Sequence, residues 1–211
     1  MPDARAAILE RIRSGLADVG PTDPDYTTIP RTYIRAGQLD LEARLHLLKE
    51  RLRDYDTNVV ETDAAHLPAT IAAVLASHQQ KNVIAADELP QEILPDNFPF
   101  IAERNASLDT LNACDGIVTR CRIAIAFTGT IVLTHGPGEG ARRLTLVPDR
   151  HLCIVRAEQV VETVPEAIDR LAPFATHPLT FISGPSATAD IEMTRIRGVH
   201  GPRFLDVVLV Q

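Results

Sequence analysis

Side chains suited to binding an anion or moving a proton gather near the carboxyl end of the chain, after an apolar run at residues 179–182. The candidate ligand-binding residues there are Ser183, Gly184, Pro185, Ser186, Thr188, Glu192 and Gly201, and the candidate catalytic residues are Asp190 and His200. We expect a strand at 179–182 that leads through Gly184 into a short helical turn, whose first backbone N–H groups have no partner within the helix. Such a corner favours binding of a carboxylate or a phosphate.

The two candidate catalytic residues carry groups that can transfer a proton. Asp190 would act as a general base or hold a substrate hydroxyl, and His200 would shuttle a proton near neutral pH or donate to a carboxylate. Structural interpretations stay open beside these. Ser186 or Thr188 would simply cap a helical turn, and the carboxylates of this segment would suit a helix dipole. His200 would then only stabilise its loop, and no serine–histidine spacing supports a hydrolase triad.

Two further segments have candidate ligand-binding residues. Thr128, Gly129 and Thr130 would form a second wall of the same pocket, or a tight turn that needs glycine for its backbone angles. The loop 136–143 holds three glycines, and its arginines Arg142 and Arg143 would grip a phosphate or carboxylate. This loop matches neither the P-loop nor the dinucleotide-binding glycine pattern, and a flexible hairpin would explain most of it.

Composition narrows the classes of function. A net charge of −7 and the lack of a lysine- and arginine-rich stripe disfavour nucleic-acid binding. The three cysteines form no Cys-x-x-Cys pair, so we expect no metal or iron–sulfur site within this chain. No apolar run is long enough to span a bilayer, and the first residues do not resemble a signal peptide. We therefore expect a cytoplasmic protein.

The apolar patterning predicts helices that alternate with short strands. Helices are expected at 3–19, 41–52, 67–77 and 107–113 and from Pro165 onward, and strands at 58–61, 82–86, 116–119, 123–127, 131–134, 144–147, 152–155, 179–182 and 205–210. The alternation indicates an α/β fold with a largely parallel sheet. No helix fits between the strands of 123–155, so this part should be antiparallel and the sheet mixed. Residues 1–38 are predicted to be a helical and extended N-terminal segment, and 39–211 the α/β domain.

Five segments carry a resemblance to a known family. The residues 183–192 read SGPSATADIE, and 198–202 read GVHGP; residues 114–119, 125–131 and 144–151 match further motifs in the same order. Together they resemble the lactate utilization protein C family, whose characteristic unit is the LUD domain. Two positions depart from the family pattern, since Phe127 stands in place of a glutamate and Thr145 in place of a serine.

The resemblance implies a fold and a role. The implied fold is a Rossmann-like three-layer α/β/α arrangement of the NagB/RpiA/CoA-transferase type. The implied role is oxidation of L-lactate to pyruvate together with separate iron–sulfur partner subunits, with this chain binding a small anionic ligand and no redox cofactor. Two alternatives remain: a stand-alone enzyme resembling sugar-phosphate isomerases or CoA transferases, with Glu139 as a nucleophile by fold analogy, and a non-catalytic scaffold that docks through residues 1–38.

Overall fold

The structure is a computed structural model that describes residues 4–17, 28–188, 196–198 and 200–211. The chain divides into two compact units, residues 1–33 and 34–211. In the first unit, α1 (Ala4–Leu16) lies within the helix predicted at 3–19, of which residues 3, 18 and 19 are outside the described part. Its apolar stripe, formed by Ile8, Ile12 and Leu16, is more than half exposed.

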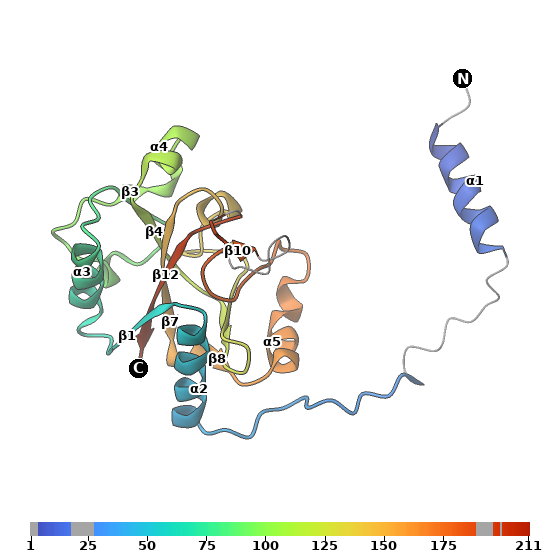
Figure 1. The fold of residues 1–211 in the computed structure, drawn as a ribbon, viewed down its shortest axis with the longest axis horizontal. Coiled ribbons are helices and arrows are strands. Elements are labelled where there is room, and N and C mark those ends of the chain that lie inside the picture. Colours follow the sequence, from blue (N-terminus) through green and yellow to red (C-terminus); the bar gives the residue numbers. More distant parts are fainter. Residues whose placement is uncertain (1–3, 18–27, 189–195, 199) are drawn as a thin grey trace. The chain divides into compact units, whose positions relative to one another are not determined.

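A six-stranded sheet forms the centre of the second unit, and every neighbouring pair in it is parallel (Figure 1). Its order is β1 (Asn58–Thr62), β12 (Phe204–Val210), β7 (Arg150–Arg156), β4 (Gly116–Arg120), β2 (Val83–Ala85) and β3 (Ile101–Ala102). The final strand β12 lies between β1 and β7 and is buried from Leu205 to Val210. A strand covered on both faces needs apolar side chains at successive positions. This run has them at every position except Asp206, whose buried carboxylate pairs with Arg150 Nη1 at 2.8 Å.

Helix α3 (Leu67–Ser77) covers one face of this sheet, with Leu67, Ile71 and Leu75 in its core. Helix α2 (Leu41–Asp54) and a second sheet cover the other face, where Leu48 and Leu52 pack with Val207 and Leu209 of β12. Asp40 caps α2, because its Oδ1 accepts a hydrogen bond from the backbone N of Ala43 at 2.8 Å.

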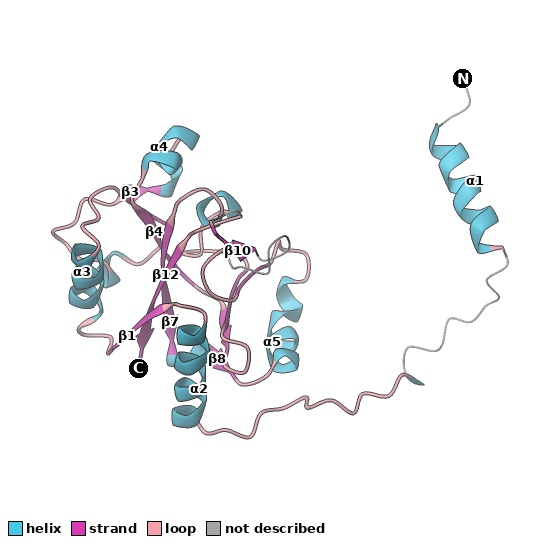
Figure 2. Ribbon diagram, viewed as in Figure 1, coloured by secondary structure: helices cyan, strands magenta, loops and turns pink. Residues whose placement is uncertain are grey.

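The second sheet has four strands in the order β8 (Val160–Val161), β5 (Ile123–Ile125), β6 (Thr130–Leu133) and β9 (Thr180–Ile182). Strands β5, β6 and β9 are antiparallel neighbours, and β8 runs parallel to β5. Helix α5 (Val164–Leu171) packs on this sheet through Ala167 and Leu171 (Figure 2). The prediction of an α/β fold with a parallel sheet and an antiparallel part is therefore confirmed, and the antiparallel part is a separate sheet.

Short elements connect these layers. They are η2 (Gln91–Ile93), η3 (Glu103–Asn105), α4 (Leu108–Ala113), η4 (Arg142–Thr145), η5 (Ala157–Gln159), η6 (Ala172–Phe174), β10 (Ala187–Thr188) and β11 (Ile196–Arg197). Within the described ranges, no helix has the length and apolar character needed to cross a membrane.

Two local predictions are wrong. The strand expected at 144–147 is largely the 3₁₀-helix η4, because the hydroxyl of Thr145 donates to the carbonyl of Arg142 and closes a turn. The helical turn expected after Ser186 is instead the strand β10, which pairs antiparallel with β11. Backbone N–H groups of a helix start are therefore not available at residues 187–188.

Candidate functional site

A cavity of about 250 Å³ lies between the two sheets, and we call it the intersheet cavity. His151 of β7 and Leu205 of β12 are register partners, so their side chains share the face of the large sheet that looks toward β9. Strand β9 supplies the opposite wall. The lining residues are Arg142, Thr145, His151, Thr180, Phe181, Ile182, Ser183, Gly184, Pro185, Ser186, Ala187, His200, Gly201, Pro202 and Leu205. The cavity thus collects the motifs around 183 and 200 that the sequence singled out.

Hydrogen bonds join the two signature segments across the mouth of this cavity. The backbone N of Ser186 donates to the carbonyl of Pro202 at 2.8 Å, and the N of Gly198 donates to the carbonyl of Ser186 at the same distance. The hydroxyl of Ser186 accepts from the backbone N of His200 at 3.2 Å. Ser186 therefore holds the loop that carries His200, and it does not cap a helix.

Gly184 sits at a position that only glycine can occupy. Its φ is +82°, and a Cβ there would lie 2.4 Å from the Cβ of Tyr55. Both the left-handed backbone and the close approach to Tyr55, the C-cap residue of α2, exclude a side chain. The glycine therefore fixes the path of the chain from β9 into the cavity wall.

The two adjacent arginines take different positions. Arg142 lines the cavity, and its Nη1 donates to the hydroxyl of Thr145 at 2.6 Å and to the Thr145 carbonyl at 3.3 Å. Arg143 is not among the lining residues, and its Nη2 instead donates to the carbonyl of Glu103 at 3.4 Å. Arg142 thus brings a permanent positive charge, held in place by Thr145, to a cavity otherwise lined by neutral and imidazole groups.

The turn Thr128–Thr130 lies behind the cavity wall and contacts the lining residue Ser183. The hydroxyl of Thr130 lies 2.7 Å from that of Thr128 and 2.8 Å from that of Ser183. Gly129, with φ +58°, packs against Arg51, and none of the three turn residues lines the cavity. The turn supports Ser183 through a chain of three hydroxyls.

Several predicted residues cannot be placed at this site. Asp190 and Glu192 lie outside the described residues. For Thr188 the structure gives a backbone pairing with Ile196. Phe127, which departs from the family pattern, is 64% exposed and does not line the cavity.

A buried histidine, His151 at the end of the family-like motif 144–151, also lines the cavity, although it was not among the predicted site residues. His151 is 1% exposed, and its Nε2 lies 2.7 Å from the hydroxyl of Thr119. The Thr119 hydroxyl also lies 3.8 Å from the sulfur of Cys153, two residues along the same face of β7. A hydrogen bond to Cys153 and complete burial raise the pKa of the neighbouring Cys121 thiol well above its ordinary value, so that thiol stays neutral. Alternate side chains of β7 lie on the same face of the sheet, so the sequence could group His151 with Cys153. It could not show that this face meets a cavity.

Glu139 is part of the framework beside this cavity. Its carboxylate is buried, pairs with the Nη2 of Arg122 at 2.8 Å, and accepts from the backbone N and the hydroxyl of Thr134. In the same loop, His135 Nδ1 lies 2.7 Å from the carbonyl of Gly140, so it must donate, and Nε2 then accepts from the Thr180 hydroxyl at 2.7 Å when the ring is neutral. Glu139 therefore anchors the loop 134–140 and is not free to attack a substrate.

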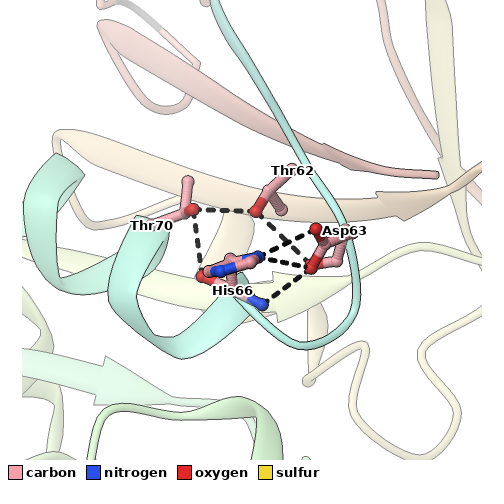
Figure 3. A network of polar contacts seen from close by, with 4 residues as sticks. All are labelled: Thr62, Asp63, His66 and Thr70. Atoms are coloured by element: carbon pink, nitrogen blue, oxygen red, sulfur yellow. Dashed lines mark hydrogen bonds and ion pairs between the residues drawn. The ribbon is translucent and has the colours of Figure 1, made fainter.

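An exposed aspartate–histidine pair lies elsewhere, at the connection from β1 to α3 (Figure 3). Asp63 accepts from the backbone N of His66 at 2.9 Å, and His66 Nδ1 lies 2.8 Å from its carboxylate. These hydrogen bonds from His66, the side-chain one first, lower the pKa of Asp63 below its usual value. The hydroxyl of Thr70 donates to Thr62 at 2.9 Å and completes the network. The pair lies at the start of α3 and does not line the intersheet cavity.

Comparison with known proteins places these features in a family. The LUD domain model matches residues 3–210. A protein named lactate utilization protein C from Deinococcus radiodurans is 40% identical over 173 residues, covering 79% of each chain. One of the same name from Anoxybacillus flavithermus is 27% identical, covering 93% of this chain and 94% of its own.

A solved structure is also similar. The crystal structure of a DUF162 family protein from Deinococcus radiodurans has a TM-score of 0.73 and 34% sequence identity, and the match covers 82% of this chain and 100% of that one. With a family model that spans nearly the whole length and a relative at 40% identity, this chain belongs to the LUD domain family, among lactate utilization proteins.

Proposed function

We propose that this chain serves an L-lactate utilization system by binding a small anionic ligand, of the 2-hydroxycarboxylate class, in the intersheet cavity. The observation that carries the proposal is the meeting of Arg142 with the signature residues Ser183–Ser186 and His200 around one cavity. A guanidinium can bind a carboxylate through two parallel hydrogen bonds. Serine hydroxyls and an imidazole nearby offer groups for the 2-hydroxyl.

The proposal includes partners. L-lactate oxidation to pyruvate releases two electrons, and we assign their transfer to iron–sulfur partner proteins, as the family resemblance implies. We expect this assembly to work in the cytoplasm. In this proposal the present chain binds the anion and presents it, with His200 or Asp190 as the proton-transferring group.

The contacts of Glu139 weigh against the transferase-like alternative. A carboxylate nucleophile needs an oxygen free to reach the substrate. Both oxygens of Glu139 have partners, Arg122 on one and Thr134 on the other. The alternative of a scaffold that docks through residues 1–38 keeps one supporting observation, the exposed apolar stripe of α1.

Growth on L-lactate tests the proposal. A strain lacking the gene should fail to grow on L-lactate and recover with the wild-type gene. It should not recover with Arg142→Ala when the variant is present at wild-type abundance. Full growth of the deletion strain on L-lactate would reject the physiological role.

A further inference from the structure

A second cavity, of about 370 Å³, lies at the carboxyl ends of the parallel strands β2 and β3, and we call it the edge cavity. It shares no lining residue with the intersheet cavity. Crevices outside the carboxyl ends of strands in open parallel sheets are the usual place for ligands in such folds. The lining residues are Ala85, Ala86, Asp87, Glu88, Leu89, Gln91, Leu94, Pro95, Asp96, Phe98, Pro99, Phe100, Ala102 and Arg104.

The charged residues of the edge cavity give it a negative balance. Three carboxylates, those of Asp87, Glu88 and Asp96, face one cation, Arg104. Arg104 Nη1 lies 3.4 Å from Oδ1 of Asp87, and this ion pair occupies one of the three carboxylates. Glu88 and Asp96 are exposed and make no hydrogen bond or ion pair with any residue that the structure describes. Two carboxylates therefore remain for a ligand.

Two aromatic rings add a second kind of contact for a cation. The centroids of Phe98 and Phe100 are 4.6 Å apart with the rings inclined at 46°, and both rings are partly buried against the core beneath α3. The face of an aromatic ring carries negative electrostatic potential and attracts ammonium and guanidinium groups. Leu89 and Leu94 supply apolar surface for a stem that carries such a group.

The backbone around Asp87 is fixed before any ligand arrives. Its N donates to Oε2 of the buried Glu103 at 3.2 Å, and its carbonyl accepts from the N of Gly138 at 2.8 Å. Ala86 N donates to the carbonyl of Val118 at 3.0 Å, which continues the pairing of β2 with β4. A site built on fixed backbone loses less entropy when it binds.

The local secondary structure also disfavours an anion. The η2 helix beside the cavity has only three residues, so it provides little of the positive end of a helix dipole. We propose that the edge cavity binds an organic cation, a primary ammonium or guanidinium group on an apolar stem. This site acts independently of the anion proposed for the intersheet cavity.

Titration calorimetry with agmatine, which carries both cationic groups on a butyl stem, tests this proposal on the full chain at low ionic strength. We expect saturable binding that weakens about fivefold in the double variant Glu88→Gln/Asp96→Asn. Each substitution removes one exposed carboxylate that would pair with a cationic group of agmatine. Phe98→Leu should weaken it about threefold through loss of the ring face. The exposed Asp169→Asn on α5 is the matched control and should bind as the wild type does.

The source of the cation is decided by a second probe, a capped peptide with one arginine between alanines. Agmatine binding that weakens in the double variant by the expected factor supports a free amine as ligand. Binding of the peptide alone, with the same weakening in the double variant, supports a basic side chain of a partner protein. The proposal is overturned if neither probe binds, if inorganic phosphate binds this cavity instead, or if the double variant binds like the Asp169→Asn control.

Discussion

The two cavities described above have opposite chemistry and lie at opposite ends of the parallel strands of the large sheet. The intersheet cavity opens near the first residues of β7 and β12 and holds Arg142 and two imidazoles. The edge cavity opens after the last residues of β2 and β3 and has three carboxylates. The parallel sheet thus separates a site suited to an anion from one suited to a cation.

One loop contacts the surroundings of both cavities. In the segment 134–140, His135 bonds to Thr180 of the intersheet cavity, and Gly138 N bonds to the carbonyl of Asp87 in the edge cavity. Glu139 anchors this segment through Arg122 and Thr134. Substitution of Glu139 should therefore weaken ligand binding in both cavities, whereas substitution of a lining residue should weaken it in one cavity only.

The largest expected effect follows from removing the anchor. Glu139→Ala leaves Arg122 without its partner in a mostly buried position, which should cost about 3 kcal/mol of the free energy of unfolding. Urea unfolding measures this, and binding of L-lactate and of agmatine should weaken together. The exposed Glu42→Ala serves as control. Unchanged stability, or a loss in one cavity only, would contradict the role given to this loop.

The next effect separates the cavities. Arg142→Ala should weaken L-lactate binding about tenfold or more, because hydrogen bonds to charged groups are worth about 1.5–3 kcal/mol. Arg143→Ala removes the neighbouring charge outside the cavity and should change the affinity little. Calorimetry on both variants makes the comparison, with agmatine binding retained in each. Equal losses from the two arginines would show that net charge, and not the cavity, attracts lactate.

A smaller effect concerns the loop that carries His200. Ser186→Ala removes the hydroxyl that accepts from the His200 backbone N–H. We expect the free energy that holds this loop in place to fall by about 1 kcal/mol. Hydrogen exchange at His200 should then accelerate while exchange in β7 stays slow. Ser77→Ala, whose hydroxyl bonds within its own helix, is the control. Unchanged exchange at His200 would mean that Ser186 does not hold this loop.

The smallest effect should leave both cavities alone. Hydrogen bonds from the backbone N of Asn82 and then of Lys81 lower the pKa of Asp115 below 3.8, its value in an unfolded chain. The ionised form is thus favoured by folding, so its stabilisation is present above that pH and disappears as the pH falls through the folded-state pKa. In the Asp115→Asn variant, the free energy of unfolding should fall less between neutral and acidic pH than in the wild type, by a difference below about 1 kcal/mol. Unfolding followed from pH 7 to pH 2 checks the sign, and a steeper acid loss in the variant would refute it.

Repeating apolar patterns allowed most of the fold to be predicted from sequence. Helix α3 begins and ends where the alanine-rich run predicted, and the apolar run 205–210, interrupted only by Asp206, identified the buried β12. The error at 144–147 has a local cause. Leucines at alternate positions mimic a strand, but the Thr145 hydroxyl and the Arg142 side chain close a 3₁₀ turn instead.

The sites were harder to predict because they depend on which faces meet. The residue types of the signature segments around 183 and 200 were enough to single them out from the sequence. That the two segments meet around one cavity became visible only in the structure, where Ser186 N donates to the carbonyl of Pro202. His151 ends the family-like motif 144–151, but the sequence does not show which face of its strand meets a cavity. The edge cavity was missed altogether, since Pro95 and Pro99 break the periodicity around Phe98. Only the strand order places that irregular segment at the carboxyl edge of β2.

The most direct test of the proposed function is recovery of the tagged protein from cells grown on L-lactate, followed by assays for iron and for L-lactate oxidation with an artificial electron acceptor. We predict that wild-type protein recovers iron–sulfur partners and oxidises lactate to pyruvate. The Arg142→Ala protein should recover the same partners with little activity. Recovery of the wild-type chain alone, free of iron and inactive, would contradict a role in a lactate-oxidising assembly.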